Sequence, residues 1–177
     1  MMEERALLCV LKQGLLFRNM EDGEILEALE TMQPRQKTYP TRTLVVRDGD
    51  LLPQIGVILS GGLHLFHIDA DGNNNLMEHL GQGDSLGILN AVGGYKLHIS
   101  AETTEQTEIL FLTVDQLLRD HVLTAPVQIR FLQNLILAAA QQAYRLTRKL
   151  EDSIRRSTRD RLQDYLSQQY HNAGSRT

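Results

Sequence analysis

The feature that most constrains this chain is a regular alternation of short apolar runs and turns between Gln36 and Thr113. The apolar runs share a length of three to six residues and stand at 44–46, 55–59, 63–68, 76–80 and 109–112. Turn sequences separate several of them, namely Gly61-Gly62, Asp71-Gly72 and Gly81-Gln82-Gly83-Asp84. Strands and turns at spacings of about ten residues are typical of antiparallel sandwiches and barrels. We therefore predict a mainly β domain for this stretch.

Two amphipathic helices are predicted before the β stretch. Apolar residues at helical spacing end at Gly14 in the first helix: Ala6, Leu7, Val10 and Leu11. The second helix lies between Glu21 and Pro34, and its predicted buried face carries Ile25, Leu26, Leu29 and Met32. Apolar residues three and four positions apart share one face of a helix, so both helices are expected to pack on the β domain.

A long helix is predicted after Pro126. Apolar residues follow one another there at alternating steps of three and four: Ile129, Leu132, Ile136, Ala139, Ala143, Leu146 and Leu150. Such a heptad a/d pattern is typical of a helix that pairs with another helix. A second apolar set beside it consists of Phe131, Leu135, Ala138 and Gln142. We predict that one set packs on the β domain and that the other forms a homodimer.

Composition and motifs exclude several classes of protein. The formal net charge is −4, whereas a domain that binds nucleic acid alone usually carries a strong basic excess. The single cysteine, Cys9, cannot form an internal disulfide or hold an iron–sulfur cluster. No secretory signal or membrane-spanning run is present in the sequence, so we expect a cytoplasmic protein.

No metal site or catalytic residue is predicted. His64 and His67 are three positions apart on a predicted strand and would point to opposite faces, so they are not expected to share an ion. No Ser-His-Asp order, phosphate-binding loop or paired-carboxylate motif stands out. We therefore expect that the protein is not an enzyme. The sequence does not reveal which cofactor or effector the protein binds.

The order of the motifs resembles the Crp/Fnr family of bacterial transcription regulators. The similar segments are 16–20 before a helix, the hairpin at 57–66, the Asp71-Gly72 turn followed by 80–87, the strand at 108–112 and the segment 159–166. The resemblance implies a double-stranded β-helix, or jelly roll, of the cyclic-nucleotide-binding type, followed by a long C-terminal dimerisation helix. It implies a sensor domain at 1–122, a dimerisation helix at 123–156 and the start of a DNA-binding domain at 157–177. Ser157 is expected to cap a new helix there, and the helix-turn-helix itself is absent from this sequence.

The resemblance also places a ligand pocket. Family members that bind cyclic nucleotides carry a cassette that begins Gly-Glu and ends Arg-Ser/Thr-Ala, in which the Arg neutralises the phosphate. Here Gly87 is followed by Ile88, and the Arg position falls on Leu97 or His98. We therefore expect cyclic AMP to bind weakly or not at all. The predicted pocket residues are Leu86, Gly87, Ile88, Leu89, Asn90, Leu97, His98 and Ser100, with Ala143 and Tyr144 from the long helix.

Three functions remain open at this point. The first is the effector-binding and dimerisation part of a Crp/Fnr-like regulator, which senses an unidentified small molecule and reaches DNA only through the absent domain. The second is a truncated, dimeric interaction module with a vestigial pocket. The third is a cupin-like metalloenzyme, which stoichiometric iron, zinc or manganese in purified protein would favour.

Overall fold

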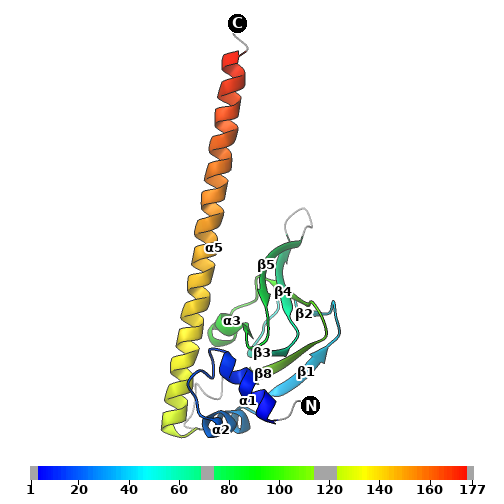
Figure 1. Cartoon of the computed structure of the whole chain (residues 1–177), viewed down its shortest axis with the longest axis vertical. Helices are drawn as coiled ribbons and strands as arrows, with labels where there is room; N and C mark the ends of the chain where they lie inside the picture. Colours follow the sequence, from blue (N-terminus) through cyan, green and yellow to red (C-terminus); the bar gives the residue numbers. More distant parts are fainter. Residues whose placement is uncertain (1–3, 69–73, 114–122, 175–177) are drawn as a thin grey trace. The chain divides into compact units, whose positions relative to one another are not determined.

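The computed structural model describes residues 4–68, 74–113 and 123–174, with the backbone alone at 74 and 152–174. The chain divides into two units, Met1–Ala139 and Ala140–Thr177, and each unit is described by itself. Figure 1 shows the strands together with α1, α2 and α3 in the first unit.

The first unit contains two four-stranded antiparallel sheets. One has the order β1-β8-β3-β6 and consists of β1 (Arg35–Tyr39), β8 (Thr107–Thr113), β3 (Gln54–Ser60) and β6 (Ser85–Leu86). The other has the order β2-β7-β4-β5 and consists of β2 (Leu44–Val46), β7 (Ser100–Thr103), β4 (Leu63–Ile68) and β5 (Asn74–Leu80). The two sheets with flanking helices form the expected jelly roll, so the predicted fold class is confirmed.

The β3–β8 pair is buried on both faces. Ile58 and its register partner Ile109 belong to the apolar cluster inside the roll, whereas Val57 and Leu110, one position earlier and later, belong to a second cluster. Alternate residues of a strand point to opposite faces, so this pair forms a wall between two cores. This arrangement explains why the apolar run at 55–59 has almost no polar interruption.

The second core joins the N-terminal helices to the sheet. Helices α1 (Glu4–Gln13) and α2 (Asp22–Met32) contribute Leu11, Ile25 and Leu29 to it. Helix α1 ends directly before Gly14, as predicted. At the start of α2 the backbone N–H of Glu21 donates to the Glu24 carboxylate at 2.8 Å, which satisfies a donor at the helix start.

Helix α5 (Ala125–Gly174) confirms the predicted long C-terminal helix and corrects one detail. We expected Ser157 to cap a new helix, but the helical backbone continues through it to Gly174. Arg and Leu recur around Ser157, and these strong helix formers outweigh the capping preference of one serine. The assignment of 157–177 to a DNA-binding domain stays a prediction.

The first turns of α5 close the second core. Their buried residues are Val127, Phe131, Leu135 and Ala138, and all four belong to the cluster that holds α1 and α2. The rings of Phe131 and Phe17 meet edge to face, with centroids 5.6 Å apart. The second apolar set of the sequence therefore packs on the first unit through Phe131, Leu135 and Ala138, as expected.

Candidate functional site

The predicted pocket segment begins with a sharp turn between β6 and α3 (Ile88–Gly93). Gly87 stands at this turn with φ of +79°, a left-handed conformation that favours glycine. A Cβ atom at Gly87 would also lie 2.6 Å from Cδ2 of Leu52, so that side chain would have to shift. The glycine is therefore required by the backbone path, whatever the segment binds.

The predicted pocket residues divide between two environments. Leu86 and Leu97 are each 1% exposed and belong to the apolar cluster inside the roll. Ile88 is also buried, but it belongs to the other cluster, on the helix side of the sheet. Leu89 is half-buried and His98 is exposed. The structure therefore brings Leu86 and Leu97 together inside the roll and does not bring Ile88 or His98 to them.

Two polar residues of the predicted pocket, Asn90 and Ser100, already have protein partners. Nδ2 of Asn90 donates to the backbone oxygen of Lys96 at 2.9 Å and closes the loop after α3. Ser100 is 4% exposed, and its Oγ accepts the backbone N–H of Asp48 at 3.1 Å. Asn90 therefore shapes the loop, and Ser100 keeps its hydroxyl hydrogen and one lone pair for a ligand.

Leu97 lies in an apolar environment inside the roll. Leu97 stands at the position where the resemblance expects an arginine, and its neighbours in the cluster are apolar, including Leu65 and Phe111. A phosphate placed among such side chains loses its hydration and gains no cation in return, which is costly. The exposed His98, the other candidate for that position, does not place its ring inside this cluster.

The predicted dimerisation residues of the first unit divide into exposed and half-buried positions. Ile129 and Ile136 are 57% and 68% exposed. Leu132 and Ala139 are half-buried and pack partly against the second core. The apolar stripe thus lies at the border between the core and solvent, with its Ile positions free to meet another surface.

The remaining predicted residues of the long helix belong to the second unit. Leu146 and Leu150 are exposed there, as are Ala143 and Tyr144. The assignment of Ala143 and Tyr144 to the ligand pocket stays a prediction, as does the pairing of Leu146 and Leu150 with a second chain.

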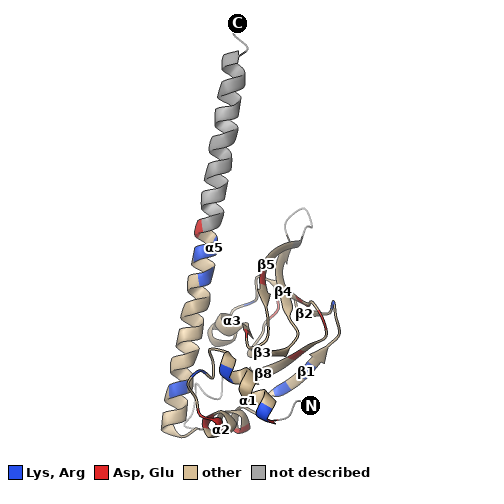
Figure 2. Ribbon diagram, viewed as in Figure 1, with Lys and Arg blue, Asp and Glu red and all other residues tan. Residues whose placement is uncertain are grey.

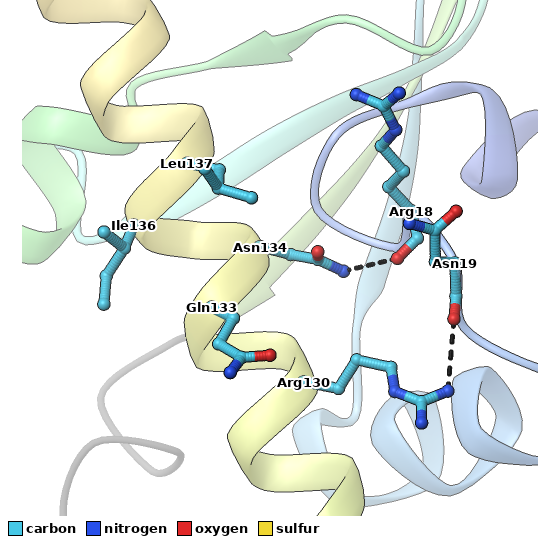
Figure 3. Close-up of a pocket in the computed structure, with 7 residues that line it drawn as sticks. All are labelled: Arg18, Asn19, Arg130, Gln133, Asn134, Ile136 and Leu137. Atoms are coloured by element: carbon cyan, nitrogen blue, oxygen red, sulfur yellow. Dashed lines mark hydrogen bonds between the residues drawn. The ribbon is translucent and has the colours of Figure 1, made fainter.

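A pocket that the sequence analysis missed lies on the first turns of α5 (Figure 3). It has a volume of about 680 Å³ and is lined by the Arg18–Asn19 loop and by α5 between Arg130 and Leu137. The two segments that line the pocket lie more than a hundred positions apart in the sequence. Only the adjacent pair Arg18 and Asn19, in the motif that precedes α2, gave a local hint of an exposed polar loop.

The histidine pair of the described residues does not form a metal site. The rings of His64 and His79 meet edge to face across β4 and β5, with centroids 5.4 Å apart. Within the described ranges, no three side chains of His, Cys, Asp or Glu are grouped so that they could hold a metal ion. Figure 2 shows the Lys and Arg positions of these ranges dispersed along the ribbon, among other places on α1, β1 and α5. No helix among the described residues is long and apolar enough to span a membrane.

The β domain is similar to a known protein family. Residues 36–119 match the family model of the cyclic nucleotide-binding domain. No curated protein sequence matches the chain. The sequence resemblance thus rests on the domain that the two sheets form.

Solved structures share the fold over most of the chain. The Thermus thermophilus catabolite activator protein aligns with a TM-score of 0.64 at 23% identity, over 80% of this chain and 62% of that protein. The sensor domain of the Pseudomonas aeruginosa transcriptional regulator DNR aligns at 0.59 and 14% identity, over 87% and 95% of the two chains. A cyclic nucleotide-binding domain from Methylobacillus flagellatus KT aligns at 0.69 and 16% identity, over 84% and 83%.

The chain covers only part of the length of some of these proteins. The chain spans less than two thirds of the Thermus protein and 42% of the Toxoplasma gondii protein kinase A regulatory domain that was solved with cAMP. The resemblance to Crp/Fnr regulators is confirmed at the level of fold, because regulators and their sensor domains are among the similar structures. Residues 36–119 thus match the cyclic nucleotide-binding domain model, and the chain shares its fold with sensor domains of transcription regulators.

Proposed function

We propose that this chain is the effector-sensing and dimerisation part of a Crp/Fnr-like transcription regulator in the cytoplasm, and that it reaches DNA through a further domain. The observation that carries the proposal is the two-sided start of α5. One side, with Val127 and Phe131, is buried in the core beneath the β domain, while Ile129 and Ile136 are exposed on another side. A helix of this kind is suited to connect a sensor domain to a second copy.

The proposed effector is a small molecule other than cyclic AMP, bound in the roll. The buried position of Leu97 supports this proposal, because an arginine there would supply the charge that a cyclic phosphate needs. Leu86 beside it offers an apolar contact. A neutral or largely apolar effector would fit these side chains better than an anion.

Coupling between effector and helix would work by a shift of populations. A ligand changes the preferred dimer geometry only if it binds one geometry more tightly than the other. Ile88, directly after the Gly87 turn, packs in the same core as Phe131 of α5. A ligand in the roll that displaces α3 would therefore also change how α5 packs in this core.

A thermal-shift screen of nucleotides, haem, organic acids and phenolics tests the proposal, together with light scattering of the purified chain. Binding to the native state raises the melting temperature, and we expect a neutral or apolar compound to do so while cyclic AMP does not. A strong shift with cyclic AMP would contradict the proposed effector class. A dimer that responds to no compound would favour the alternative, an interaction module with a vestigial pocket.

A further inference from the structure

We propose that the pocket between the Arg18–Asn19 loop and α5 is a second ligand site, which takes a small organic anion with an apolar body. The site is separate from the roll, because none of the residues that line it belongs to the roll's interior cluster. Its volume of about 680 Å³ falls within the range of small-molecule pockets, which is about 300–1,000 Å³.

Hydrogen bonds from α5 hold the Arg18–Asn19 loop in place beside the pocket. Asn134 is 6% exposed, and its Nδ2 donates to the backbone oxygens of Leu16 and Arg18 at 3.1 and 2.8 Å. These two hydrogen bonds fix the loop against α5, as Figure 3 shows for the bond to Arg18. Asn19 has φ of +57°, a conformation uncommon for residues other than glycine, which turns the chain at the edge of the pocket. The loop is thus preorganised before any ligand arrives.

The charge of the pocket favours an anion. Nη1 of Arg130 donates to Oε2 of Glu24 at 2.9 Å and to the backbone oxygen of Asn19 at 3.1 Å, so this arginine is already neutralised. The guanidinium of Arg18 has no hydrogen bond or ion pair within the described part of the chain. One uncompensated guanidinium fork therefore stands at the rim, and a carboxylate is a natural partner for it.

An apolar wall completes the site. Arg130, Asn134 and Leu137 are spaced i, i+4 and i+7 and share one face of α5, which points toward the loop in Figure 3. Leu137 is 60% exposed and points toward the loop, whereas Ile136, at the pocket's outer edge, points away from the loop and belongs to the side of α5 proposed to meet a second copy. A chain of several methylene groups on the anion would cover Leu137, and each buried methylene adds to the affinity.

Calorimetric titration with octanoate tests the site, with octanamide and butyrate as matched probes. Octanoate should bind saturably, octanamide more weakly because it lacks the charge, and butyrate more weakly because it lacks the apolar chain. The variant Arg18→Gln should weaken octanoate binding by about tenfold or more, because a hydrogen-bonded charge pair is lost.

The matched control is Arg35→Gln, which removes the same charge from an exposed position on β1 outside the pocket. It should bind octanoate as the unmodified chain does. Equal affinities of Arg18→Gln and Arg35→Gln would overturn the proposal, and so would the absence of saturable octanoate binding. Binding that survives Arg18→Gln would place octanoate elsewhere, for example in the roll, and would leave the proposed function standing while refuting this site.

Discussion

The edge-to-face pair of Phe17 and Phe131 should make a large contribution to the stability of the first unit. The two side chains are 1% and 0% exposed, and they join the α1–α2 connection to α5. Replacement of a buried phenylalanine by alanine typically costs about 3–5 kcal/mol in the free energy of unfolding. We expect Phe131→Ala to fall in that range, and Phe17→Ala to be comparable.

The losses of stability in the two variants should not be fully additive, because both substitutions remove the same ring contact. An aromatic pair contributes about 0.5–1.5 kcal/mol beyond the burial of its area. The double variant should therefore be less destabilised, by about that amount, than the sum of the two single variants. With a urea m-value of about 2 kcal/mol/M, a loss of about 4 kcal/mol lowers the midpoint of unfolding by about 2 M.

Urea unfolding followed by circular dichroism, at one fixed protein concentration, measures these midpoints. Leu137→Ala serves as the control, because this leucine is 60% exposed on the same helix, and its substitution should change stability by no more than about 0.5 kcal/mol. If Phe131→Ala shifts the midpoint no more than Leu137→Ala does, α5 does not close the core as described. Strict additivity of the two Phe substitutions would show that the rings do not interact.

Three further predictions concern the dimer seam, two glycines and cyclic AMP. Ile136→Glu should convert a dimer to monomers without unfolding, because its side chain is 68% exposed; an unchanged mass in light scattering would refute the predicted seam. Gly61→Ala should destabilise the roll by more than about 1 kcal/mol, because φ is +78° and a Cβ would lie 2.5 Å from a backbone oxygen. Gly23→Ala should instead stabilise the chain by about 0.5–1 kcal/mol, because Gly23 lies in α2 with open space around its Cβ position. Equal changes in the free energy of unfolding for the two variants, measured by chemical unfolding, would contradict this geometry. Excess cyclic AMP should leave the melting temperature unchanged, because the arginine position holds Leu97 or His98, and a clear rise would show that the roll binds it by other contacts.

Strands with apolar patterns were predictable from the sequence, whereas polar ones were not. The runs at 44–46 and 63–68 coincide with β2 and β4. Strand β1 was missed, because its sequence Arg-Gln-Lys-Thr-Tyr shows no apolar alternation and its first four residues are exposed. It lies at the edge of its sheet and takes its extended form from pairing with β8. Local propensity does not encode such a partner-dependent strand.

The candidate site was predictable only where the backbone dictates the residue. Gly87 lies at the turn before α3, where the left-handed backbone conformation requires glycine. The burial of Leu97 beside Leu86 and the engagement of Asn90 by its own loop depend on contacts that periodicity does not reveal. The pocket at Arg18 was out of reach for a similar reason, since Arg18 and Arg130 approach each other only in the folded chain.

The side chain of Asn134 has a mechanical consequence for any signal that α5 carries. If α5 slid along its axis by one turn, about 5.4 Å, Nδ2 would leave the carbonyl oxygens of Leu16 and Arg18 behind. Each stranded carbonyl that found no water would cost about 1–3 kcal/mol. Sliding is therefore the disfavoured motion, and the start of the helix should tilt or rotate only as one piece with the connection between α1 and α2.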